Sequence, residues 1–177
     1  IFTRSNNEQI LATGIQKILV SIESTDNQTF KAIRGGKLEK VINGIESLME
    51  MRRKYEQPNP RIGFAVTVLR QTVPAISGIA HLYKELELDG GITLQKLQTM
   101  PQYREHYSSA MYSQIMRDQD IRELQHIVKN DPVVSRALQQ ESATGNFYST
   151  LYAGKGKSWD ICPWLEKCLY ITVSGMA

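Results

Sequence analysis

RIGFAVTVL, residues 61–69, decides the fold, because it is a nearly continuous apolar run rich in valine. KILVSI, residues 17–22, is a second run of the same character. Such runs are typical of parallel strands that are covered on both faces. A third segment, GITLQKLQ at residues 91–98, alternates apolar and polar residues, so one of its faces should meet polar surroundings. The three segments predict the strands of a parallel sheet.

Helical patterns separate these strands. Apolar residues recur at helical spacing over 41–49 and again over 76–86, and a short helix closed by Gly14 precedes the first strand. Helices that alternate with strands indicate right-handed βαβ crossovers and a parallel sheet, either doubly wound or a barrel. Because three strands cannot close a barrel, the chain is expected to be part of a larger fold.

The pattern changes after Pro101. Residues 105–141 predict two or three helices, the last of which opens at Asp131-Pro132 with an N-cap and a proline in the first turn. Residues 144–158 read as a loop-rich link, and CLYITVSG near the end of the chain predicts one more strand.

Composition excludes several classes of function. Lys plus Arg number 21 and Asp plus Glu 18, a net charge of +3 that is too small and too dispersed for a nucleic-acid interface. The densest basic run, Arg52 to Lys54, is expected to end a helix, where it complements the helix dipole and needs no partner. The sequence contains no stretch of 18 apolar residues, so it predicts no membrane-spanning helix. Only two cysteines are present, so a reducing cytoplasm is the expected location.

Candidate ligand-binding residues follow the first strand, since ligands collect at the carboxyl ends of parallel strands. Alternation places Ser21, Glu23 and Thr25 on one face, where a hydroxyl and a carboxylate suit an amino-acid or ribose ligand. The alternative is that Ser21 is a small filler and Glu23 a solvated strand end. Arg34, followed by two glycines and a helix, predicts either an anion site or a flexible turn.

Two further groups are weaker candidates. Tyr103, Arg104 and His106 cluster just beyond a strand end, where they would grip a substrate or simply begin a polar helix. Cys162 and Cys168 read as half of a metal site, a disulfide or two buried thiols, since zinc and iron–sulfur sites take three or four ligands.

Two longer strings carry a family resemblance. GIQKILVSIESTDNQTFKAIRGGKLEKVINGIESLMEMRRK, residues 14–54, resembles the middle of radical S-adenosylmethionine (radical SAM) enzymes, in which a strand ending in Ser-hydrophobic-acid precedes "tFkaIRgg" and a helix. CPWLEKCLYITVSGMA, residues 162–177, looks like the opening of the SPASM domain that follows many such barrels. The resemblance covers most of residues 10–100 and again 160–177.

The resemblance implies a fold and a division of the chain into domains. Residues 1–100 would be the C-terminal portion of a partial (β/α)6 TIM-like barrel with parallel strands, residues 101–160 a helical linker, and residues 161–177 the first strand of a truncated SPASM-type domain. The family's CxxxCxxC motif, the first barrel strands and the later SPASM cysteines are absent from the sequence. We expect an excerpt of a longer polypeptide, inactive alone, with a degenerate relative as the alternative.

The resemblance also implies an activity. In this family a [4Fe–4S] cluster, reduced by an external electron donor, cleaves S-adenosylmethionine, and the 5′-deoxyadenosyl radical abstracts a substrate hydrogen. SPASM members often modify peptides or proteins, which is the substrate class expected here. The alternatives are a radical SAM enzyme for a small molecule and a non-catalytic α/β binding module that has lost its cluster. No catalytic residue and no oligomeric state is assigned.

Site residues carry over by position. Ser21 matches the strand-end hydroxyl that contacts the methionine or ribose part of the cofactor, with Glu23 beside it. Arg34 matches a position that reaches the cofactor carboxylate, and Gln95 and Leu97 would approach the adenine. The auxiliary [4Fe–4S] cluster would be ligated by Cys162, whereas Cys168 is either a further ligand or a core thiol.

Overall fold

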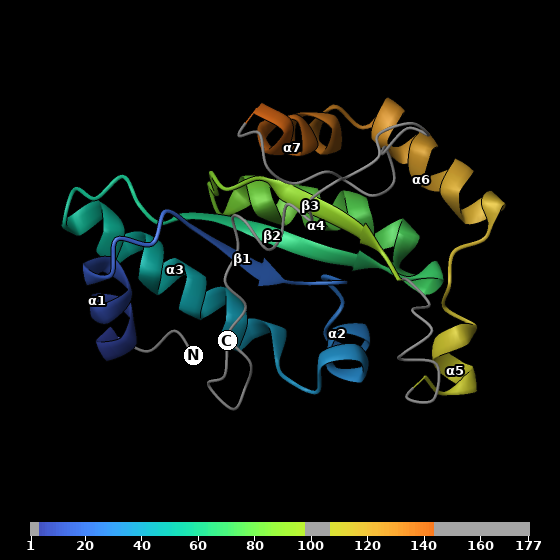
Figure 1. The fold of residues 1–177 in the computed structure, drawn as a ribbon, viewed down its shortest axis with the longest axis horizontal. Helices are drawn as coiled ribbons and strands as arrows, with labels where there is room; N and C mark the ends of the chain where they lie inside the picture. The colour runs from blue at the N-terminus through green and yellow to red at the C-terminus, as the bar shows by residue number, and fades with distance from the viewer. Residues whose placement is uncertain (1–3, 98–106, 144–177) are drawn as a thin grey trace, which may run out of the picture.

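A three-stranded parallel sheet forms the centre of the chain (Figure 1). The computed structural model describes residues 4–97 and 107–143. The strands are β1 (Lys17–Ser21), β2 (Arg61–Val68) and β3 (Ile92–Lys96), in the order β1-β2-β3. The predicted α/β class and parallel strand direction are therefore confirmed at this level.

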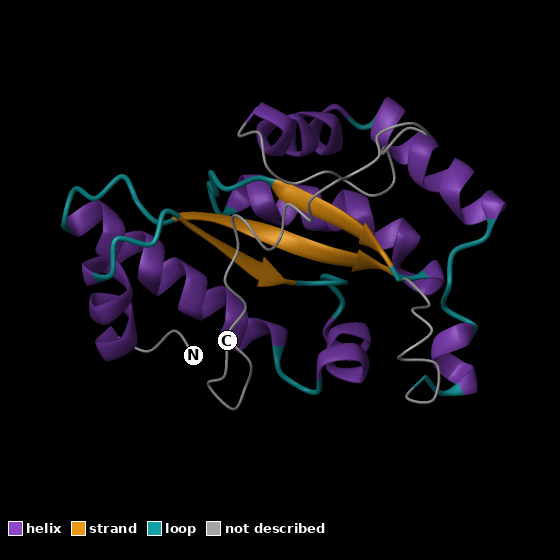
Figure 2. Ribbon diagram, in the orientation of Figure 1, coloured by secondary structure: helices purple, strands orange, loops and turns teal. Residues whose placement is uncertain are grey.

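Helices connect and follow the strands. The structure describes α1 (Arg4–Ala12), α2 (Asn27–Arg34), α3 (Leu38–Lys54), a 3₁₀ helix η1 (Arg70–Ala75), α4 (Ile76–Glu85), α5 (Ser109–Tyr112), α6 (Asp118–Asn130) and α7 (Pro132–Ala143). The carboxyl ends of the strands point toward the side where α2 and α5 lie (Figure 2). No helix among the described residues has the length and apolar character needed to cross a membrane.

The connections place α3 and α4 on the same face of the sheet. Right-handed crossovers between strands in consecutive order put each connecting helix on one side. The rings of Phe64 on β2 and Tyr83 on α4 meet edge to face at 6.1 Å, so Phe64 marks the helix-covered face. On β2 and β3 this face carries five apolar residues that are at least 97% buried, Ile62, Val66, Val68, Ile92 and Leu94. At its carboxyl end it also carries the half-buried Lys96, which pairs with Val68.

Helix α2 follows β1 and was not predicted. Its N-cap is Asp26, whose carboxylate accepts hydrogen bonds from the backbone N–H and the hydroxyl of Thr29 at 2.8 and 2.7 Å. The backbone hydrogen bond from Thr29 is the main reason why the pKa of Asp26 lies below its usual value. The helix ends at Gly35, which adopts a left-handed conformation (φ 73°).

Helix α7 begins where the sequence predicts. The carboxylate of Asp131 accepts the backbone N–H of Val133 at 2.9 Å, and Pro132 is the first helical residue. Partial burial alone would raise the pKa of Asp131. Hydrogen bonds from the Ser77 hydroxyl and the first backbone amides of α7 outweigh this and, with His81 nearby, lower it. The start of α7 is thereby tied to α4, against which the helix packs.

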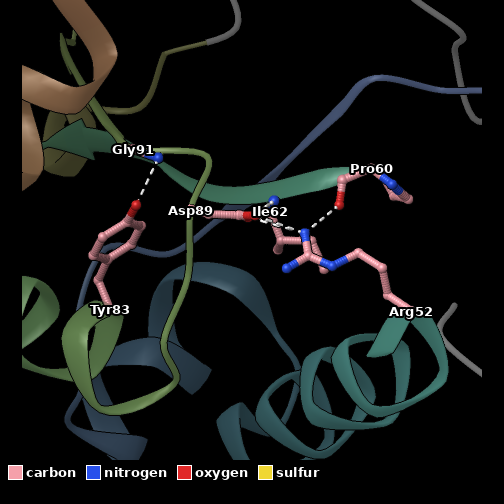
Figure 3. Close-up of polar contacts among 6 residues, drawn as sticks. All are labelled: Arg52, Pro60, Ile62, Tyr83, Asp89 and Gly91. Carbon is pink, nitrogen blue, oxygen red and sulfur yellow. Dashed lines mark hydrogen bonds and ion pairs between the residues drawn. The ribbon is translucent and has the colours of Figure 1, made fainter. Parts of the chain in front are cut away.

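A polar clamp joins three segments at the amino end of the sheet (Figure 3). Arg52 at the end of α3 donates from Nη1 to the carbonyl of Pro60 and to Oδ2 of Asp89, both at 2.8 Å. The other carboxylate oxygen of Asp89 accepts the backbone N–H of Ile62 at 2.9 Å. The expectation that the basic run needs no partner is wrong for Arg52, because its side chain is only 11% exposed and must be paired.

Beside this clamp, two glycines bring the backbones of β2 and the β3 lead-in into direct contact. A Cβ atom on Gly63 would overlap the carbonyl oxygen of Gly91 and lie 2.7 Å from the carbonyl carbon of Gly90. Gly90 in turn donates its backbone N–H to Ile62 at 2.7 Å. From α4, the hydroxyl of Tyr83 accepts a hydrogen bond from the backbone N–H of Gly91 at 2.9 Å (Figure 3). Only glycine fits at positions 63 and 90.

We expect Gly63→Ala to lower the free energy of unfolding by at least ~2 kcal/mol, because backbone atoms cannot yield to the added methyl group. Gly36→Ala is the matched control: no atom lies within 4 Å of the added Cβ, so its effect should stay within about 0.5 kcal/mol. Urea unfolding followed by circular dichroism measures both. Equal midpoints for the two variants would show that the close approach does not exist in solution.

Candidate functional site

Uncharged polar side chains line the carboxyl half of the sheet face opposite Phe64. In the strand register Ser21 pairs with Ala65, and Ala65 pairs with Thr93. Paired residues share a face, and so do residues two apart on one strand. Thr67 and Gln95, paired with each other, therefore extend this face toward the carboxyl edge. We call Ser21, Thr67, Thr93 and Gln95 the polar row.

Access to the polar row differs from residue to residue. Ser21 is exposed at the end of β1, whereas Thr67 and Gln95 are half-buried. Ala65, also half-buried, leaves space between Ser21 and Thr93 because its side chain is a single methyl group. Hydroxyl and amide groups both donate and accept hydrogen bonds, so this edge suits a ligand with neutral polar groups.

Thr93 is the most unusual member of the polar row. It is 2% exposed, and its Oγ1 has no hydrogen-bond partner among the described residues. The alternation of residues 91–98 predicted one polar-facing side for β3, but Ile92, Thr93 and Leu94 are all buried. A buried hydroxyl without a partner costs stability, which natural sequences tolerate mainly where the group serves a ligand or a bound water.

Two predicted site residues, Glu23 and Arg34, contact each other. Nε of Arg34 donates to Oε2 of Glu23 at 2.6 Å, and Nη2 of Arg34 pairs with Oε1. The Glu23 side chain is 1% exposed and that of Arg34, the last residue of α2, is 38% exposed. This bidentate geometry neutralises the buried carboxylate and ties the end of α2 to the loop after β1. Within the described residues Nη1 of Arg34 makes no hydrogen bond, so it keeps donors for a further anion.

The alternation predicted for Ser21, Glu23 and Thr25 does not continue past the strand. β1 ends at Ser21, and the chain then turns into α2. A Cβ on Gly78 would lie 2.9 Å from the Thr25 hydroxyl, so Thr25 is next to α4. Of these three residues, only Ser21 therefore belongs to the polar row, while Glu23 serves the ion pair.

The remaining predicted residues divide into two groups. Gln95 near the end of β3 and Leu97 just beyond it are half-buried at the same edge as Ser21. The other predicted residues lie outside the described part of the chain: Tyr103, Arg104, His106, Cys162 and Cys168.

The described residues do not fit an iron–sulfur cluster. In residues 4–97 and 107–143 no three His, Cys, Asp or Glu side chains gather in a way that could hold a metal ion. Of the two histidines there, His81 is 62% exposed and 3.7 Å from Asp131, and His126 is exposed and contacts Asn130. Both therefore lie on helix surfaces.

Comparisons with protein-family models, with curated proteins and with solved structures find no match to this chain. The geometry of the carboxyl edge and the sequence resemblance are therefore the basis for a function. Thr67 and Thr93 were not predicted as site residues. Their place in the polar row follows from the strand register, which no local motif encodes.

We expect Thr93→Val to leave the free energy of unfolding unchanged or to raise it by up to ~1 kcal/mol, because the substitution removes an unpaired buried hydroxyl at nearly constant volume. Thr72→Val is the matched control. Thr72 is equally buried, but its Oγ1 bonds both the backbone N–H and the carbonyl of Leu69, so this variant should lose ~1–3 kcal/mol. Chemical denaturation compares the two. A loss at Thr93 as large as that at Thr72 would mean that the Thr93 hydroxyl has a partner.

Proposed function

We propose that this chain is the C-terminal part of the barrel of a radical SAM enzyme and that the carboxyl edge of its sheet faces S-adenosylmethionine. The observation that carries the proposal is the difference between the two faces of the sheet. One face is apolar except for Lys96 at its carboxyl end and is covered by α3 and α4, whereas the other presents uncharged polar groups at its carboxyl end. That division is expected of a barrel wall, with helices outside and a ligand-facing interior.

The residues at this edge fit the neutral and zwitterionic parts of S-adenosylmethionine. The exposed Ser21 hydroxyl both donates and accepts, which suits a ribose hydroxyl or the amino-acid group of the cofactor. Gln95 and Leu97, half-buried on the far strand, would lie against the adenine. Glu23 holds the Arg34 guanidinium from one side, so that Nη1 is left for the cofactor carboxylate. Glu23 thus acts as a positioning residue in this proposal.

The [4Fe–4S] cluster of such an enzyme would supply the electron that cleaves S-adenosylmethionine. Because the described residues offer no ligand set for it, the cysteines of a CxxxCxxC motif must come from elsewhere in the complete polypeptide. Cys162 stays a prediction as a ligand of an auxiliary cluster, and Cys168 as either a further ligand or a core thiol. Peptide or protein modification is the proposed role, and it rests on the SPASM resemblance of residues 162–177. The proposed location, the cytoplasm, rests on the small number of cysteines.

The complete gene product, reconstituted anaerobically with iron and sulfide, tests this function. With a reductant and S-adenosylmethionine we expect 5′-deoxyadenosine, measured by mass spectrometry. Ser21→Leu should raise the Kd for S-adenosylmethionine at least ~10-fold without unfolding the protein, because Ser21 is exposed and the larger side chain blocks the edge. Ala12→Leu adds a side chain of the same size at an exposed position at the end of α1 and should leave the Kd unchanged.

Two results would contradict the proposal separately. A gene without a CxxxCxxC motif upstream of Ser21, together with no 5′-deoxyadenosine, would favour a non-catalytic binding module. An unchanged Kd in Ser21→Leu would return Ser21 to the role of a small filler, even if the enzyme cleaves its cofactor.

A further inference from the structure

A pocket lies between α4 and α7, away from the polar row. Its volume is about 360 Å³, which falls at the lower end of the range for small-molecule sites. It opens where α4 ends and the chain leads toward the start of β3, near the amino end of the sheet. The residues that line it are Tyr83, Lys84, Glu87, Leu88, Pro132, Val133, Arg136 and Ala137.

The lining combines an apolar floor with a charged rim. Leu88 and Ala137 are 6% and 3% exposed, and Val133 is half-buried beside them. Lys84 and Arg136 are both exposed, one on α4 and the other on α7. The two cations thus approach the same opening from two helices that pack against each other.

The charges at the rim do not cancel within the described residues. Neither Lys84 nor Arg136 makes an ion pair there, although the pocket also contains the carboxylate of Glu87. That carboxylate is 78% exposed and lies 3.6 Å from Arg53, outside the pocket lining. Among the described residues, an anion in the pocket would therefore meet two cations that have no ion-pair partner, while the one acidic group of the lining there has a cationic partner of its own.

We propose that this pocket binds a small organic anion with an apolar body, such as an aryl or alkyl carboxylate. The apolar part would cover Leu88, Val133 and Ala137, and the anionic head would lie between Lys84 and Arg136. Burial of the apolar part provides most of the affinity, and the two cations select a negative charge over a neutral polar group. This site is independent of the function proposed for the carboxyl edge.

The experiment is an NMR titration of the ¹⁵N-labelled 177-residue chain with 4-phenylbutyrate, alongside its neutral analogue 4-phenylbutanamide. We expect amide shifts concentrated at residues 83–88 and 133–137. For a ligand of about twelve non-hydrogen atoms, ordinary ligand efficiency gives a Kd of roughly 2 mM. The amide should bind about 5-fold more weakly, and raising the NaCl concentration to about 0.5 M should weaken only the carboxylate.

Matched variants separate charge from shape. Lys84→Gln with Arg136→Gln should raise the Kd of 4-phenylbutyrate about 5-fold, whereas Lys84→Arg with Arg136→Lys should keep it within about 2-fold. The control pair Arg122→Gln with Lys129→Gln removes two cations from exposed positions of α6 and should change nothing.

The proposal is overturned by any of three results. The first is that no amide shifts appear at residues 83–88 and 133–137 up to about 20 mM ligand, whether or not shifts appear elsewhere in the chain. The second is equal affinity for the amide and the carboxylate, which would make the pocket a non-selective apolar depression. The third is an equal loss of affinity in the α6 control pair, which would show that only the net charge matters.

Discussion

The close contact of β2 with the β3 lead-in, between Gly63 and Gly90, is the constraint on which the rest of the structure depends. No larger residue fits at either position, and the Arg52–Asp89 clamp holds the same segments from the side of α3. Together they fix the register of the sheet at its amino end. Because side chains alternate along a strand, a shift of one residue would exchange the apolar face with the polar one. The contacts at the amino end of the sheet thus determine which side chains lie on each face at its carboxyl end.

The carboxyl end shows the consequence. The register brings Ser21 and Thr93 to one level of the sheet with only Ala65 between them. Nearby, the Glu23–Arg34 pair stabilises the loop that follows β1. A buried ion pair contributes little net stability, since the desolvation of two charges offsets their attraction, but loss of one partner leaves an unpaired charge. The pair therefore holds Arg34 in position, and the Thr93 hydroxyl, which has no partner among the described residues, remains available to a ligand or a water.

Much of the fold follows from local sequence patterns. The apolar runs identify β1 and β2, helical spacing identifies α3 and α4, and Asp131-Pro132 gives the start of α7. Helix α2 escapes prediction because it has only eight residues and buries only Phe30; its bounds are marked by the Asp26 cap and by Gly35. The site is less predictable. Arg52 and Asp89 are 37 positions apart, and the pairing of Glu23 with Arg34 depends on a helix that local patterns do not reveal.

The central proposal is that the carboxyl edge of the sheet binds S-adenosylmethionine. Hydrogen–deuterium exchange of the reconstituted complete enzyme, with and without S-adenosylmethionine, tests it most directly. We expect slower exchange on binding for amides at residues 21–24, 65–69 and 93–97, and no change at residues 88–91 beside the clamp. Protection that is absent from all three carboxyl-end segments, or confined to the amino end, would contradict the claim.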